Sequence, residues 1–137
     1  MGRVRVRTFS LEEANRALPR VRRHVERIVE LGLRLSELHD DLAIATYRSG
    51  RPGSSEQEQQ AVATATDRLR RAEEGFLAAL HALEAIGVEL KDVRNGLVDF
   101  PSVRENAAVE LCWRLGEERV AHWHIPGAGH GGRAPLG

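Results

Sequence analysis

Residues 49–55 read Ser-Gly-Arg-Pro-Gly-Ser-Ser, a composition that is costly inside a helix and typical of a loop. On each side of this loop, mostly apolar residues recur in alternating steps of three and four, which is the heptad rhythm of packed helices. Before the loop, the repeating positions are Leu18, Val21, Val25, Ile28, Gly32, Leu35, His39 and Leu42. After the loop, they are Val62, Ala65, Leu69, Ala72, Phe76, Ala79, Leu83 and Ile86. The sequence therefore predicts two long helices that pack antiparallel, in the manner of a two-helix coiled coil.

Short local signals bound the two predicted helices. Ser10, followed three residues later by Glu13, forms the pattern of a capping box, so the first helical segment is expected over residues 11–48. Pro19 lies inside this segment and has no backbone N–H, so we expect the helix to break or kink there. The second long helix is expected over residues 56–86.

From residue 87 onward, the pattern changes to short runs of β-branched and aromatic residues separated by turn signals. We expect a small antiparallel β-sheet over residues 87–126, followed by a glycine-rich tail over residues 127–137. The whole chain, residues 1–137, is predicted to be a single α+β domain in which a long antiparallel helix hairpin precedes this small C-terminal sheet.

The pairing of the last two predicted strands stays open at this stage. His122 and His124 share one face of their strand, because side chains alternate between faces. A connecting loop of two or four residues pairs Cys112 with Trp123, whereas a loop of three residues pairs Cys112 with His124. A slip of one residue exchanges the two faces of a strand, so the sequence does not decide whether Cys112 and His124 lie together.

The composition limits the class of protein. The chain has 137 residues, of which 42% are hydrophobic, enough for one core and too few for two typical domains. No apolar run is long enough for a membrane span and the N-terminus lacks the apolar segment of a signal peptide, so we expect a soluble cytoplasmic protein without a membrane partner. The 20 basic residues are balanced by 20 acidic ones, which argues against a general nucleic-acid binder.

Charged residues of the C-terminal third are candidates for structural or ligand-binding roles. They are Lys91, Asp99, Arg114, Glu117 and Arg133. An ion pair of Lys91 with Asp99 or Asp92 is expected on the sheet. A second ion pair, of Arg133 with Asp99 or Glu117, would pin the tail onto the sheet.

The same region holds a candidate set of metal ligands. Cys112 is the only cysteine, which excludes an internal disulfide and a multi-cysteine zinc site, so a metal would also need histidine and carboxylate ligands. The candidates are Asp99, Cys112, His122 and His124. They could hold a divalent metal in the register that places Cys112 and His124 on one face. As a free nucleophile Cys112 is less favoured, because a cysteine within an apolar strand is usually an inert core residue.

Several segments resemble the bacterial domain-of-unknown-function family twenty-two-oh-three over essentially the whole chain. The segments are Phe9-Ser10-Leu11-Glu12-Glu13-Ala14-Asn15, Leu18-Pro19, Gly87-Val88-Glu89-Leu90-Lys91-Asp92, Gly96-Leu97-Val98-Asp99-Phe100-Pro101, Leu111-Cys112-Trp113-Arg114-Leu115-Gly116-Glu117, Trp123-His124 and Gly132-Arg133-Ala134-Pro135-Leu136. The resemblance implies no activity. One departure is His130, at a position where members of the family usually carry an aromatic residue between Gly129 and the Gly132-Arg133 pair. His130 either replaces the packing of that aromatic residue or weakens the ordering of the tail.

Apolar residues outside the heptad positions widen the apolar stripe of both helices. They are Leu31, Leu38 and Ala45 on the first helix, and Leu77 and Leu80 on the second. A two-helix hairpin does not cover such a stripe by itself, so we expect a homo-oligomeric binding or interaction module that self-associates through its helices. The alternative is a small metal-binding protein or metal-dependent enzyme that uses the His/Cys/Asp cluster. Neither the residues nor the resemblance assigns a reaction, a ligand or a cofactor beyond a possible divalent metal.

Overall fold

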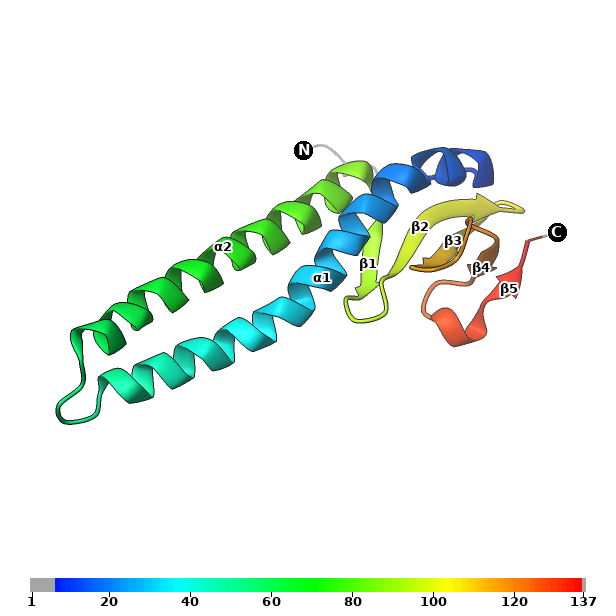
Figure 1. The fold of residues 1–137 in the computed structure, drawn as a ribbon. Helices are drawn as coiled ribbons and strands as arrows, with labels where there is room; N and C mark the ends of the chain where they lie inside the picture. Colours follow the sequence, from blue (N-terminus) through cyan, green and yellow to red (C-terminus); the bar gives the residue numbers. More distant parts are fainter. Residues whose placement is uncertain (1–6, 137) are drawn as a thin grey trace, which may run out of the picture. The chain divides into compact units, whose positions relative to one another are not determined.

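The computed structural model describes residues 7–136 and has an α+β fold (Figure 1). Two long, antiparallel, packed helices, α1 (Leu11–Ser49) and α2 (Glu56–Ile86), precede the sheet, as predicted. The five strands that follow are β1 (Glu89–Asp92), β2 (Leu97–Arg104), β3 (Ala107–Arg114), β4 (His122–His124) and β5 (Ala134–Pro135). Within residues 7–136, neither helix is both long and apolar enough to cross a membrane.

Both helices begin with a capping box. At the start of α1, the backbone N–H of Glu13 donates to Ser10 Oγ (3.1 Å), and the backbone N–H of Ser10 donates to the Glu13 carboxylate (3.0 Å). Ser55 and Glu58 make the same pair of bonds at the start of α2, each 3.0 Å long. These bonds satisfy backbone N–H groups that have no partner within a helix, so the helix starts follow directly from the local sequence.

Helix α1 continues through Pro19 without a break in its secondary structure. Figure 1 shows its first turns, in dark blue, inclined to the turns that follow. Pro19 removes one backbone hydrogen bond, but Leu18 and Val21 beside it are buried, and their packing holds the helix together across the missing bond. Of the two outcomes expected at Pro19, the break therefore does not occur.

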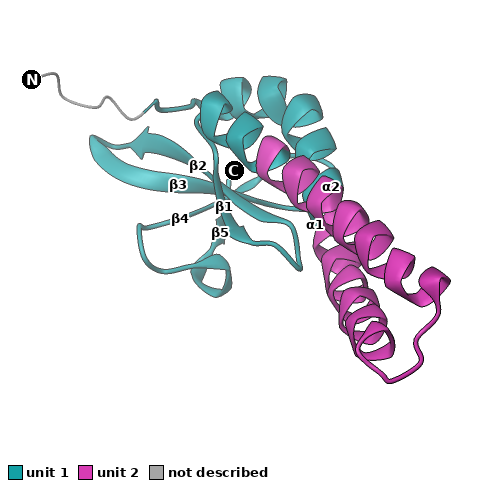
Figure 2. Cartoon of the chain, turned by 90° about the vertical axis from the view of Figure 1, so that its left-hand side faces the viewer, with its two compact units in different colours: residues 1–29, 79–137 teal, residues 30–78 magenta. Residues whose placement is uncertain are grey.

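The described chain divides into two compact units, residues 7–29 with 79–136 and residues 30–78 (Figure 2). The second unit contains the loop between the two helices and the parts of α1 and α2 that adjoin this loop. Its core consists of buried Leu31, Leu38, Leu69 and Ala72, flanked by the partly buried side chains of Leu35, Leu42 and Phe76.

The predicted heptad positions of α2 are buried or, at Val62 and Phe76, partly buried. On α1, the predicted positions Leu35 and Leu42 pack against the core of the second unit, whereas Gly32 and His39 are each off by one residue. His39 is exposed and Gly32 only partly buried, while their neighbours Leu38 and Leu31 are buried. The predicted and the observed buried positions both recur in steps of three and four residues, so sequence spacing does not choose between them. The leucines occupy the buried positions because burying a leucine side chain is about 1.5–3 kcal/mol more favourable than leaving it exposed, whereas glycine has no side chain to bury.

All five strands form one antiparallel sheet in the order β1-β2-β3-β4-β5. The first four strands lie within the region predicted to be a sheet, residues 87–126. The fifth, Ala134–Pro135, pairs with β4 and belongs to the tail that was predicted only as glycine-rich. A strand of two residues is too short to show an alternating pattern, so its pairing is a tertiary property.

One face of the sheet packs against the N-terminal part of α1. Its side chains include fully buried Val98 and Phe100 from β2 and Trp113 from β3. The guanidinium of Arg22 on α1 lies 5.7 Å from the centre of the Trp113 ring and donates to the carbonyl of Glu118 (3.0 Å). The apolar face is therefore covered by helix, and the polar residues of the same strands point to the opposite face.

Asn15 ties α1 to the segment that leads into β4. The buried Val120 donates its N–H to Asn15 Oδ1 (2.8 Å), and Asn15 Nδ2 donates to the carbonyl of Val120 (3.1 Å). A single side-chain amide thus satisfies both backbone groups of Val120, which would otherwise be costly to bury. This bond pair helps to set where the chain enters β4.

We predict that Gly96→Ala destabilises the first unit more than Gly116→Ala. Both glycines have a positive φ, 65° and 106°, but a Cβ on Gly96 would lie 2.7 Å from Leu115 Cβ and 2.9 Å from Val25 Cγ1. Among the described residues, nothing lies within 4 Å of a Cβ on Gly116. Backbone strain costs each variant about 1–3 kcal/mol, and crowding adds about 1–3 kcal/mol at Gly96 alone. Chemical denaturation measures both, and equal losses would contradict the tight packing of Gly96 against α1.

Candidate metal centre

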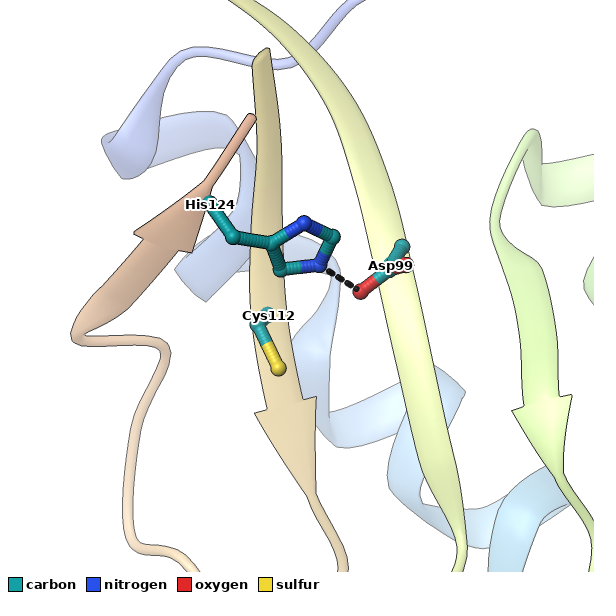
Figure 3. Close-up of side chains that lie close together, drawn as sticks. All are labelled: Asp99, Cys112 and His124. Carbon is teal, nitrogen blue, oxygen red and sulfur yellow. Dashed lines mark hydrogen bonds and ion pairs between the residues drawn. The ribbon is translucent and has the colours of Figure 1, made fainter. Parts of the chain in front are cut away.

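Three of the four predicted metal ligands lie together on the polar face of the sheet. Asp99 is on β2, Cys112 on β3 and His124 on β4, and Figure 3 shows their side chains side by side. Asp99 pairs with Cys112 across β2 and β3, while Cys112 pairs with His122 across β3 and β4. Paired residues share a face, so Asp99, Cys112 and the alternate residues of β4 project to the same side.

The three side chains are buried and close. Asp99 Oδ1 lies 3.1 Å from His124 Nε2. One ligand atom from each of Asp99, Cys112 and His124 lies within 4.8 Å of the other two. The exposed fractions of these residues are only 4%, 1% and 3%. A carboxylate, a thiol and an imidazole therefore converge in an environment with little water.

The fourth predicted ligand, His122, is not part of this group. Its Nδ1 lies 3.8 Å from Glu117 Oε2, toward the end of the sheet where the tail returns. Cys112 and His124 share a face, as in one of the two registers considered above, but Cys112 pairs with His122 and Glu110 pairs with His124. The pairing is shifted by two residues because residues 115–121 connect the strands, a longer segment than a tight hairpin turn.

The hydrogen bonds of His124 decide which of its ring nitrogens carries a proton. Nδ1 lies 2.9 Å from the carbonyl oxygen of Ile125, which can only accept, so Nδ1 must be the donor. Nε2 then faces Asp99 either as a second N–H or as a free lone pair. Burial lowers the pKa of His124, but the bonds to the Ile125 carbonyl and to the Asp99 carboxylate outweigh it and raise the pKa overall.

Glu110 is a further acidic group beside this cluster. It lines a cavity of about 190 Å³ together with Asp99, Cys112 and His124. Its Oε2 atom is buried and has no hydrogen-bond partner among the described residues. The interaction with Asp99 and burial both raise the pKa of Glu110. The prediction of ligands missed Glu110, although strand alternation places it on the same face as Cys112.

Cys112 is not activated as a free nucleophile. Burial raises the pKa of its thiol to about 11, so the thiol stays protonated at neutral pH. Its Sγ lies 3.4 Å from Nδ1 of His130, which belongs to the 3₁₀ turn His130–Gly132 in the tail. Burial, with a contribution from Arg133, lowers the pKa of His130. A divalent cation would be needed to displace the thiol proton at neutral pH.

The segments that form this site coincide with those quoted above for the family resemblance. The family model described as an uncharacterized conserved protein, DUF2203, matches residues 7–136. The chain belongs to the DUF2203 family. No curated protein and no solved structure matches the chain. Membership in DUF2203 therefore supplies no activity, and the chemistry of the site has to be argued from its own geometry.

One of the two predicted ion pairs holds the tail of this DUF2203 chain. Arg133 Nη1 lies 3.0 Å and 2.9 Å from the two carboxylate oxygens of Glu117, a partner expected from the sequence. Glu117 Oε1 also accepts the backbone N–H of Arg114 (2.8 Å), whose own side chain is exposed. Lys91 pairs instead with Glu89 (2.8 Å), a residue that was not among its expected partners. Glu117 thus links the end of β3 to the tail.

We predict that Glu117→Gln lowers stability at neutral pH and that the loss disappears in acid. Burial raises the pKa of Glu117, but the bonds from Arg133 and from the Arg114 N–H outweigh it and hold the pKa below its ordinary value of 4.5. A carboxyl group with a lowered folded-state pKa stabilises the fold above its unfolded-state pKa and loses this effect as pH falls through the folded value. The expected loss at pH 7 is about 1–3 kcal/mol, vanishing below the folded-state pKa.

Chemical denaturation at several pH values checks this prediction, with Glu118→Gln as the matched control. The Glu118 side chain is exposed and its contact with Arg22 uses the backbone carbonyl, which the substitution keeps. A loss for Glu117→Gln that is the same at pH 3 and pH 7 would contradict the charge-assisted bond.

Proposed function

We propose that the chain binds a transition-metal ion, Zn²⁺ above all, through Asp99, Cys112 and His124. The observation that carries this proposal is the convergence of three chemically different donors, from three neighbouring strands, within 4.8 Å of one another in a buried site. The donors would be a carboxylate oxygen of Asp99, the thiolate of Cys112 and Nε2 of His124.

The donor set favours zinc over hard cations. Zinc in proteins is bound by cysteine sulfur, histidine nitrogen and carboxylate oxygen, whereas Mg²⁺ and Ca²⁺ prefer oxygen ligands alone. The Asp99 carboxylate and the Cys112 thiolate together would balance the two positive charges of the ion. The pairing of Nδ1 of His124 with a backbone carbonyl is also the arrangement that orients metal-binding histidines, since it leaves Nε2 for the metal.

An ion pair between Asp99 and His124 is the simplest competing explanation of the cluster. It accounts for the 3.1 Å contact of those two residues, but not for the buried Glu110 Oε2 that lacks a partner among the described residues on the same cavity. Buried polar atoms without a partner are rare, and they often mark an unrecorded ion or water. The metal proposal accounts for the whole cluster.

We predict that untagged protein binds Zn²⁺ at near-stoichiometric amount, and that Cys112→Ser and His124→Ala each weaken binding by about 100-fold or more. Mass spectrometry of metal content and competition with a chromophoric chelator measure this. Co²⁺ as a substitute ion should show thiolate charge-transfer absorption that Cys112→Ser abolishes. His122→Ala is the matched control, because His122 lies on the same strand face but outside the group.

The outcomes separate clearly. Zinc that stays bound in His122→Ala and is lost in His124→Ala supports the proposal. Protein that takes up no zinc or cobalt when either is supplied in excess overturns it and leaves Asp99 and His124 as a structural ion pair. Thermal melts of the metal-free variants show whether each one still folds. Bound metal should also raise the melting temperature of the wild-type chain, because a ligand of the folded state stabilises that state.

The expectation that the hairpin leaves Leu31, Leu38 and Ala45 uncovered is wrong, because these side chains are buried within the chain itself. A second candidate function, self-association through the helices, is supported instead by other, exposed apolar side chains of residues 30–78. Leu33, Ile44 and Tyr47 on α1 have exposed fractions of 65%, 49% and 72%. Their spacings of eleven and three residues are close to whole helical turns, so they share one face of α1. Such a patch on the surface of a chain typically marks an interaction site.

The occupant proposed for this face is a second copy of the chain. A groove of about 760 Å³ beside Ile44 is lined by both acidic and basic side chains, Asp41 and Glu58 against Arg48 and Arg68. Glu58 is already paired with Arg51 of the same chain (2.8 Å). A two-fold axis through the groove would allow Asp41 of one copy to face Arg48 or Arg68 of the other, so the groove offers charges of both signs to a second copy.

We predict that the wild-type chain sediments as a dimer at micromolar concentration and that Ile44→Glu sediments as a monomer. The added charge would have to be buried against an apolar surface, which is unfavourable. Val103→Glu is the control, since Val103 is comparably exposed (59%) but lies on β2. A wild-type chain that sediments as a monomer at this concentration would rule out the helix interface.

A further inference from the structure

The segment between β4 and the tail strand crosses the cavity that contains the metal cluster. We call residues 126–133 the strap. Gly127, Gly129 and His130 line the cavity together with the three proposed ligands. Gly127 and Gly129 have positive φ values of 87° and 70°, and among the described residues nothing lies within 4 Å of a Cβ on either. At these two glycines the strap therefore has open space beside its backbone.

Both ends of the strap are fixed to the sheet. At its C-terminal end, Arg133 pairs with Glu117, and Ala134 pairs with Trp123 on β4. The backbone N–H of Leu136 also donates to the carbonyl of Ala121 (2.8 Å). At its N-terminal end, the strap begins two residues after His124, the last residue of β4. The anchored ends keep His130 over the site although the glycines between them leave the backbone free to adjust.

Two contacts in the site are close in length to the distances between neighbouring ligands of a tetrahedral zinc centre. With Zn–N and Zn–O bonds of about 2.0–2.1 Å and a Zn–S bond of about 2.3 Å, neighbouring ligand atoms at tetrahedral angles lie about 3.3–3.6 Å apart. The contact between Cys112 Sγ and His130 Nδ1 is 3.4 Å, and that between Asp99 Oδ1 and His124 Nε2 is 3.1 Å. The two contacts share no atom, so they would form opposite edges of a tetrahedron of ligands. His130 lies outside the group of ligand atoms within 4.8 Å of one another, so the strap would have to move inward to complete that tetrahedron.

We infer that His130 is the fourth ligand of the metal centre and that the strap closes the site around the ion. This inference rests on the proposed function. It specifies a zinc site with four protein ligands, Asp99, Cys112, His124 and His130. Zinc sites of this kind are structural, whereas catalytic zinc sites keep one position open for water or substrate. Metal binding would then fasten the strap to the sheet and would not expose a reactive water.

Glu110 is the rival for the fourth position, because its unpartnered Oε2 lies on the same cavity. Neither Glu110 nor His130 belongs to the group of ligand atoms that lie within 4.8 Å of one another, so the choice between them rests on their contacts. His130 Nδ1 lies 3.4 Å from Cys112 Sγ, whereas the interaction of Glu110 is with Asp99. We therefore assign Glu110 as a positioning residue, which acts on the metal through the neighbouring Asp99 carboxylate. Glu110→Gln keeps a neutral hydrogen-bond donor at this position and removes the carboxylate that a ligand role would need.

The test compares wild type, His130→Phe and Glu110→Gln, each loaded with Co²⁺ or Zn²⁺. Phenylalanine keeps an aromatic ring in the strap but offers no ligand atom. We expect the wild type to show the intense visible absorption of four-coordinate Co²⁺. His130→Phe should lose this intensity, keep the thiolate charge-transfer band from Cys112, and bind Zn²⁺ about 10- to 100-fold more weakly. Glu110→Gln should keep tetrahedral Co²⁺ absorption and should bind Zn²⁺ more tightly than His130→Phe does.

Limited proteolysis gives a second readout. Zinc should protect the strap from cleavage near Gly127 and Gly129 in the wild type but not in His130→Phe. Tetrahedral absorption and zinc protection that both persist in His130→Phe would overturn the inference, as would their loss in Glu110→Gln alone. Failure of the underlying metal proposal is distinguishable, because the wild type itself would then lack the thiolate band. Thermal melts of the metal-free variants confirm that each one folds.

Discussion

The backbone pairing of β3 with β4 is the constraint on which the candidate site depends. Glu110 pairs with His124, and Cys112 with His122, so the even-numbered residues of both strands share the polar face. A slip of one residue would turn His124 toward the face covered by α1 and bring Trp123 to the polar face. The bonds between Asn15 and Val120 lie just before β4 and help to exclude that slip.

Glu117 has a comparable role at the end of β3. Its carboxylate accepts the Arg114 N–H and pairs with Arg133 of the tail, while its carbonyl accepts the indole N–H of Trp113 (3.0 Å). A half-buried carboxylate with charge-assisted partners is worth more than an exposed ion pair, because solvent screens it less. The helix-covered core, β3 and the tail therefore meet at one residue, which is why the tail forms a strand although its own residues are mostly glycine and alanine.

Burying ionisable groups on the polar face of the sheet is energetically unfavourable for a small protein. Burying Asp99 and His124 removes two ionisable groups from water, and such pairs are often no more stable than apolar replacements. A functional role therefore explains the presence of this cluster better than a purely structural role does. A bound cation would turn the cost of desolvation into binding energy, because the same low dielectric that penalises lone charges strengthens their attraction to a metal.

Local patterns in the sequence account for the helices, the cap of the first helix, the loop between the helices and the extent of the region that forms the first four strands. They also account for the ligand types and for the fact that His122 and His124 share a face. They do not separate Leu38 from His39 as the buried position, because both fit a heptad and only side-chain packing favours the leucine. Nor do they reveal β5 or the contact of His130 with Cys112.

The sequence by itself therefore determined the α+β order of elements and the set of residues available for chemistry, since capping, periodicity and turn signals act between residues close in the chain. The tertiary structure alone decided that Asp99, Cys112 and His124 meet and that His122 does not. That choice depends on the β3–β4 register across residues 115–121 and on the return of the tail to β4. Such pairings are set by contacts between distant segments, and no local pattern encodes them.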